Sequence, residues 1–214
     1  DSPCGGELVI DVGANLGTFT LAAAARGCRV HAFEAQRKAW RALSMSVLAN
    51  GFDASPGVEV HHAAVWHTAG ERLAVDAPES NQGGAAVGAP AAPPGAGFSY
   101  DPERSAPTVV LDDLFPGDAE ALLMKVDVEG AEVAVLASAK RMLSERRVRH
   151  VVVEMHAGSE QIMRDLHAWG YECRKTGSSQ EDAIPALEGA TTPPPEPMEY
   201  LIELVGDLAG DVYR

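Results

Sequence analysis

The sequence predicts a single α/β domain with a mostly parallel β-sheet and helices on both faces. Short apolar runs alternate with helical stretches along the 214 residues, and this alternation implies right-handed β-α-β crossovers. Several apolar runs end in acidic residues followed by glycine, as at the carboxyl ends of strands that bind ligands. Residues 151–153 are three valines, as expected of a strand buried on both faces. With 46% hydrophobic residues, one domain over 1–214 can bury a core.

The elements follow from hydrophobic periodicity and from glycine stop signals. The last two strands lack a convincing helix between them, so the final strand is predicted to run antiparallel to its neighbour. Residues 77–107 are predicted to be a long inserted loop, because Ala, Gly and Pro dominate 83–97 without any period. The predicted strands are 7–11, 28–33, 58–65, 108–111, 122–128, 148–155, 171–175 and 199–205, with a short extra strand at 72–75. One predicted helix ends near residue 26, and the others span 36–50, 131–143 and 159–169.

Composition limits the partners and the compartment. The formal net charge of -14 disfavours nucleic acid and anionic membranes as partners, and no apolar run is long enough to span a bilayer. The three cysteines form no C-x-x-C pair and are predicted to be structural thiols, which favours a reducing, cytoplasmic compartment. No signal peptide is visible, and the start at Asp1 suggests a piece of a longer product.

The strongest local motif is Asp-Val-Gly-Ala-Asn-Leu-Gly at 11–17, between the first strand and the first helix. Gly13 allows a tight turn against a ligand, Asn15 tolerates a left-handed backbone, and Gly17 lets the helix pack on the sheet. The G-x-G-x-x-G spacing of dinucleotide enzymes is absent. A nicotinamide-dependent oxidoreductase is therefore the weaker alternative, and a plain strand-turn-helix corner is another.

Glu34, at the end of the second strand, is the second signal. An acid at this place can accept hydrogen bonds from both ribose hydroxyls of a nucleoside. Exposed glutamates are common, so Glu34 indicates a nucleoside site only together with the glycine turn that precedes it at this spacing in the sequence.

Together with Lys125-Val-Asp-Val-Glu-Gly-Ala-Glu132 and Glu154-Met-His156, these motifs resemble the FkbM family of S-adenosylmethionine (SAM)-dependent methyltransferases. The resemblance runs from about residue 7 to 156. It implies a Rossmann-like class I methyltransferase fold, with a seven-stranded, mostly parallel sheet whose last strand is antiparallel. It also implies O-methylation of a hydroxyl on a small molecule or carbohydrate. This sequence departs from the family in having Ala35-Gln36 where a proline is usual, and in the insertion near 83–97.

The resemblance also assigns cofactor residues by position. Asp11, Gly13, Ala14, Asn15 and Gly17 would line the methionine part of SAM. Glu34 would hold the ribose, with Ala35 beside it. Residues 62–64, including Ala63, would approach the adenine, and Asp127 would face the same cleft.

The catalytic candidates are Asp127, Glu129, Glu154 and His156, at or just past the ends of two adjacent strands. A hydroxyl nucleophile needs a proton acceptor, and His156 could serve as this base. Alternatively, Asp127, Glu154 and His156 could bind a divalent metal that acidifies the hydroxyl.

Three further interpretations remain open. Glu129 and Glu132 could simply stabilise the following helix, because negative side chains interact favourably with the positive end of the helix dipole. A non-enzymatic module that keeps the fold and binds a partner is also compatible with the sequence. His31 and His61 show no ligand spacing and are interpreted as structural.

Overall fold

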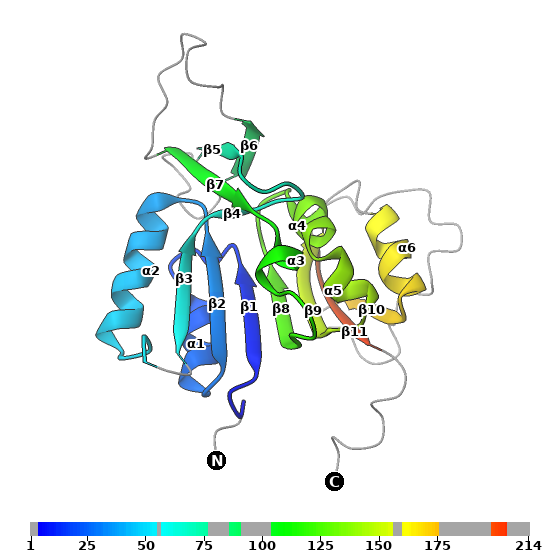
Figure 1. Cartoon of the computed structure of the whole chain (residues 1–214), viewed down its shortest axis with the longest axis horizontal. Coiled ribbons are helices and arrows are strands. Elements are labelled where there is room, and N and C mark those ends of the chain that lie inside the picture. The colour runs from blue at the N-terminus through cyan, green and yellow to red at the C-terminus, as the bar shows by residue number, and fades with distance from the viewer. Residues whose placement is uncertain are drawn as a thin grey trace.

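The computed structural model describes residues 4–54, 57–76, 86–90, 104–155, 160–175 and 198–204. Its main feature is a seven-stranded sheet in the order β10-β11-β9-β8-β1-β2-β3 (Figure 1). In that order the strands are Tyr171–Lys175, Met198–Leu204, Val148–Met155, Ala121–Val126, Leu8–Val12, Arg29–Glu34 and Val58–His62.

Five of these strands, from β9 to β3, pair in parallel. β11 is antiparallel to both β10 and β9, between which it is inserted. The predicted α/β class and the antiparallel final strand are confirmed. The parallel pairing stops at β9, because the next strand in the sheet, β11, runs antiparallel to it.

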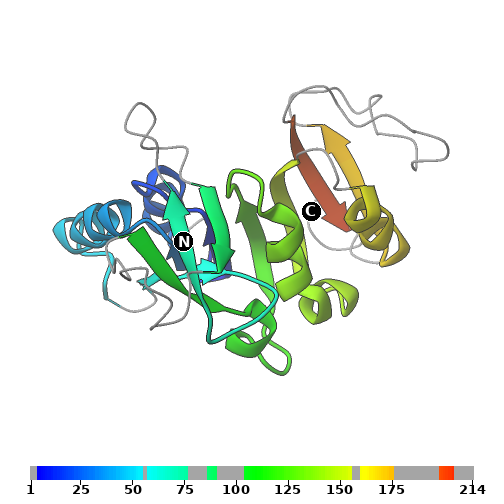
Figure 2. The same ribbon diagram turned by 90° about the horizontal axis from the view of Figure 1, so that it is seen from above.

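Helices cover both faces of the sheet, as Figures 1 and 2 show together. α1 (Thr18–Ala25) and α2 (Arg37–Ala49) lie on one face, where Leu43 and Val47 pack with Val9 and Val30. The opposite face carries α3 (Leu111–Leu114), α4 (Glu132–Ser138), α5 (Lys140–Ser144) and α6 (Glu160–Ala168). The main core lies there, and its members include Ile10, Val12, Met124, Leu136 and Leu166. Consecutive strand residues such as Val9 and Ile10 therefore enter different cores, as strand alternation requires.

A second, four-stranded sheet lies above the carboxyl ends of β2 and β3 (Figure 1). Its order is β4-β7-β5-β6, and these strands are Ala64–Val65, Ser105–Val109, Arg72–Asp76 and Ala86–Pro90. The predicted single strand 58–65 is broken at Ala63, because Ala64 and Val65 leave β3 and pair with Thr108 and Val109.

The prediction of one structureless loop over 77–107 is wrong at two places. Residues 86–90 form β6, and β7 begins at Ser105. β6 pairs antiparallel with β5 at the edge of its sheet, and an edge position tolerates its Pro90. The Ala- and Gly-rich segment that contains β6 shows no hydrophobic period, because an edge strand can form through backbone hydrogen bonds to its neighbour without an alternating apolar face.

The prediction that all cysteines are thiols is also wrong. Cys4 and Cys28 form a disulfide with a Cα–Cα distance of 5.0 Å, because they precede β1 and β2, which are parallel neighbours. This disulfide does not favour a reducing compartment. Cys173 is free, and burial raises the pKa of its thiol to about 12. Among the described residues, none of the helices is both long and apolar enough to span a membrane.

Candidate functional site

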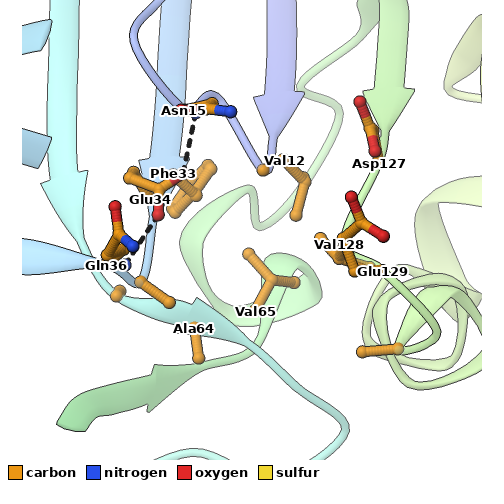
Figure 3. Close-up of a pocket in the computed structure, with 14 residues that line it drawn as sticks. Val12, Asn15, Phe33, Glu34, Gln36, Ala64, Val65, Asp127, Val128 and Glu129 are labelled. Carbon is orange, nitrogen blue, oxygen red and sulfur yellow. Dashed lines mark hydrogen bonds between the residues drawn. The ribbon is translucent and has the colours of Figure 1, made fainter. Parts of the chain in front are cut away.

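A pocket of about 170 Å³ opens at the carboxyl ends of β1, β2 and β8, below the second sheet (Figure 3). Glu34 and Asn15 lie on one side of it, and Asp127, Val128 and Glu129 lie on the other. Its lining residues are Val12, Gly13, Asn15, Phe33, Glu34, Ala35, Gln36, Ala63, Ala64, Val65, Asp127, Val128, Glu129 and Ala131. Residues from both of the sequence motifs thus meet in one cavity, as the order of the parallel strands requires.

The turn after β1 approaches the end of β8 so closely that only glycine fits. Gly13 has φ +79°, and a Cβ built on it would lie 1.8 Å from the Asp127 backbone oxygen. The amides of Gly13 and Ala14 both donate to the Phe33 carbonyl, at 3.0 and 3.1 Å. The backbones of β1, β2 and β8 therefore hold this turn in place, and residue 13 contributes only backbone atoms to the pocket.

Two other residues of the motif support the turn from outside the pocket. Gly17 has φ 91° and precedes α1, and a Cβ on it would lie 2.2 Å from Leu43 Cδ1 of α2. Ala14 is buried against the same helices. Neither residue lines the cavity, so their structural contribution is the close packing of α1 on the sheet.

Glu34 is a buried carboxylate held by backbone donors. Its Oε2 accepts a 2.7 Å hydrogen bond from the Asn15 amide, and its Oε1 accepts one of 2.6 Å from the Gln36 amide. Burial raises the pKa of the Glu34 carboxyl, and these two hydrogen bonds oppose the rise. Each carboxylate oxygen has a further lone pair, so a ligand in the pocket can donate to both oxygens.

Asn15 adopts the left-handed backbone predicted for it, with φ 51°. This conformation directs its amide to Glu34. The glycine turn and the acid on the second strand, which sequence reasoning connected only by spacing, are thus joined by a hydrogen bond.

Asp11 does not line the pocket but is completely buried beneath it. Thr20 Oγ1 donates to Asp11 Oδ2 at 2.5 Å, and Lys125 Nζ lies 3.7 Å from Oδ1. Burial raises the pKa of Asp11, whereas the Lys125 charge opposes the rise. Within the described part of the chain, Oδ1 has no hydrogen-bond partner, so the Lys125 ammonium is the charge that balances it.

Lys125 joins three parts of the site, although sequence reasoning gave it no role. Its Nζ lies 3.1 Å from Asp127 Oδ2 and donates to the Gly13 carbonyl at 3.4 Å, besides facing Asp11. The sequence signal that could have found this role is strand alternation, which places the side chains of residues 125 and 127 on the same side of the strand. Pairing of Lys125 with Asp11 across the sheet completes the arrangement.

The turn after β8 supplies the second wall. Glu129 is exposed and has φ 54°, an uncommon conformation for a residue with a side chain. Glu132 Oε1 accepts from the amides of Val128 and Gly130 at 3.3 and 3.0 Å. Glu132 lies in the first turn of α4, as the helix-dipole interpretation predicts, while Glu129 faces the pocket without such a bond among the described contacts.

Small apolar residues form the wall beneath the second sheet. Ala35, Ala63, Ala64 and Val65 line it, and the buried alanines leave room for a flat apolar ring. His62 does not line the pocket; its Nε2 lies 3.2 Å from the Ala35 carbonyl, and its ring packs on Trp40.

Of the remaining two catalytic candidates, Glu154 does not line this pocket. Glu154 lies near the end of β9, opposite Glu199 of β11, and is half-buried. His156 lies outside the described residues. The set Asp127, Glu154 and His156 therefore stays a prediction, both as a metal site and as a base.

Comparison with solved structures supports the fold. The chain is 11% identical to a provisionally described rRNA methylase of Clostridium thermocellum, with a TM-score of 0.50 over 94% of this chain and 88% of that one. The identity to an rRNA methylase of Streptococcus thermophilus is 13%, with a TM-score of 0.49 over 94% of this chain and 87% of that one. The identity to a provisionally described tRNA (m1A22) methyltransferase of Streptococcus pneumoniae is 12%, with a TM-score of 0.48 over 93% of this chain. The chain spans 64% of the length of that protein. Identities this low concern the fold alone.

Comparison with curated proteins gives no match. The sequence does match the family model described as the Methyltransferase FkbM domain, over residues 11–173. This match covers more than half of the chain and includes both walls of the pocket. The chain therefore belongs to the FkbM methyltransferase domain family.

Proposed function

We propose that this protein is a SAM-dependent O-methyltransferase that acts on a hydroxyl of a small molecule or carbohydrate. The observation that carries the proposal is Glu34, a buried carboxylate whose two oxygens are held by backbone amides at the pocket wall. A carboxylate held in this way is suited to two neighbouring hydroxyls of a ribose.

The other residues of the pocket fit the remaining parts of SAM. Gly13 and Asn15 of the turn after β1 line the pocket, and the methionine part of SAM would lie against them. Ala35 and Ala63 offer an apolar surface for the adenine. Asp127 and Glu129 line the pocket while Lys125 pairs with Asp127, and this surplus of negative charge favours a cationic ligand.

SAM, when bound, supplies a methyl group on a positively charged sulfur. The protein must then hold the acceptor hydroxyl in line and provide a group for its proton. We assign this proton acceptor to Glu129, because Asp127 is already paired with Lys125 at 3.1 Å. Glu154 and His156 remain the alternative pair, with or without a divalent metal.

The acceptor class follows from charge. A net charge of -14 opposes the approach of a phosphate backbone, whereas neutral sugars and small alcohols meet no such barrier. The likeness to rRNA methylases concerns the fold, and an RNA acceptor is therefore included as an outcome to be tested.

Calorimetric titration with SAM tests the ribose assignment. Glu34→Ala removes acceptors for two charge-assisted hydrogen bonds, each worth about 1.5 to 3 kcal/mol, so we expect at least a tenfold loss of affinity. Glu34→Gln keeps the shape and should also bind more weakly. The matched control is Glu120→Ala, on an exposed position. Unchanged affinity in both Glu34 variants would refute the ribose role.

Transfer of labelled methyl from SAM to an acceptor panel tests the reaction. The panel contains sugars, small alcohols, phenols and RNA. Transfer to a hydroxyl of a small molecule supports the proposal, and transfer to RNA alone contradicts it. Tight SAM binding without any transfer would favour a non-enzymatic binding module instead.

A further inference from the structure

Two histidines and a glutamate gather on β2 and β3, away from the pocket. His31 pairs with Glu59 across the two strands, and Phe33 pairs with His61. Positions 31 and 33 on β2, and 59 and 61 on β3, are two residues apart and so point to the same face of the sheet. The face is the one that carries α3, since His31 contacts Phe115 edge-on.

The ligand atoms of this cluster are close enough to share one ion. His31 Nδ1 lies 3.1 Å from His61 Nε2, and His31 Nε2 lies 3.7 Å from Glu59 Oε1. One ligand atom from each residue lies within 4.8 Å of the other two. Zinc–nitrogen bonds of about 2.0 to 2.1 Å would place two nitrogens 3.1 Å apart at roughly 100°, near the tetrahedral angle.

The surroundings hold the imidazoles and leave one side open. The His61 ring stacks on Phe33 with a centroid distance of 4.5 Å and on His31 with one of 5.3 Å. The His31 side chain is 17% exposed, whereas that of Glu59 is 66% exposed. β3 is the last strand of the sheet, so an ion can enter from its edge.

We propose that His31, Glu59 and His61 form a binding site for a divalent transition-metal ion of the zinc type, which joins the edge strand β3 to β2. Two imidazoles and one carboxylate are a known zinc ligand set, and water completes such a site. Imidazole ligands favour zinc over magnesium or calcium, which prefer oxygen ligands. The ion would replace the His31–His61 hydrogen bond and would tie together strands whose ends carry Glu34 and Ala63.

Calorimetric titration of the purified chain with zinc, in a buffer free of chelators, tests this site. We expect one zinc ion per chain with micromolar affinity, and no comparable binding of magnesium. Zinc at about 100 times its Kd should raise the Tm by about 5 °C or more, and chelation should reverse the rise. Cobalt in place of zinc should give the visible absorption bands of a tetrahedral site.

Variants distinguish this site from other histidines and from the SAM pocket. His31→Ala and His61→Ala should each weaken zinc binding at least about tenfold, whereas His167→Ala, an exposed histidine on α6, should not. Glu59→Gln alters an exposed side chain and should fold even if the histidine variants do not; it should weaken binding too. Glu34→Ala should leave zinc binding intact, so the two proposals can fail separately. Equal zinc affinity in wild type and Glu59→Gln, or no stoichiometric binding by wild type, would overturn the proposal.

Discussion

The two walls of the pocket are built on opposite principles. On the wall at β1 and β2, Glu34 is the one charged side chain among the described lining residues, and it is buried and held by the amides of Asn15 and Gln36. On the wall at β8, Asp127 and Glu129 carry charge, Lys125 pairs with Asp127, and the Asp127 side chain is 45% exposed. The first wall presents carboxylate oxygens fixed by backbone hydrogen bonds, and the second keeps charged groups near water. The proposed function would place recognition of SAM on the first wall and the chemical step on the second.

The comparison depends first on the contact between the walls at Gly13. Gly13→Ala would place Cβ 1.8 Å from the Asp127 carbonyl oxygen, so the walls must separate. We expect loss of measurable SAM binding and a drop of about 3 kcal/mol or more in the free energy of unfolding, measured by calorimetry and urea denaturation. Gly117→Ala is the control, because Gly117 has φ +71° with open space around it. If both variants lose equal stability, backbone strain and not the close approach explains the effect.

The second prediction concerns the chemical wall alone. Glu129→Gln should lower kcat by about 100-fold through loss of the proton acceptor, while SAM affinity stays as in wild type. Rates with the acceptor found by the panel, together with SAM titration, measure the two effects.

Glu129→Gly separates activity from backbone strain. It should be equally inactive yet more stable by about 1 kcal/mol, because φ 54° suits glycine. Full activity in either variant would move the role of base to Glu154 or His156.

The third prediction tests whether Lys125 connects the walls. Lys125→Met leaves the buried Asp11 without its cation and should lower the free energy of unfolding by about 2 kcal/mol. Lys125 is 18% exposed, so the loss should be smaller than for a fully buried pair. Lys38→Met, on an exposed position of α2, is the control in urea denaturation. An equal, small loss in both variants would show that Asp11 does not depend on Lys125.

The smallest expected effect is a pH dependence. Burial raises the pKa of Asp11, so the folded state holds this proton more tightly than the unfolded chain does. The resulting stability is present at acid pH and is lost as pH rises through the raised folded pKa. Asp11→Asn cannot lose a proton, so its stability relative to wild type should rise as the pH increases from about 4 to about 8. Urea unfolding across this range measures it, and a constant difference would contradict it.

Much of the pocket could be predicted from the sequence, because local rules governed it. The Gly13 turn, the left-handed Asn15, Glu34 and Asp127 lie at ends of parallel strands, and such ends meet at one edge of a sheet. The role of Lys125 and the split of 58–65 into β3 and β4 were missed. Both depend on pairings, with β1 and with β7, between residues far apart in the chain.

Periodicity and turn residues act over a few neighbouring positions, so the sequence was enough to predict the alternation of strands and helices, the antiparallel last strand and the order of the motifs. Which strands lie side by side depended on tertiary packing. That choice produced the Cys4–Cys28 disulfide, the second sheet and the cluster of His31, Glu59 and His61. Register between strands brings together residues with no sequence spacing in common, because it is set by the packing of whole faces and not by neighbouring residues.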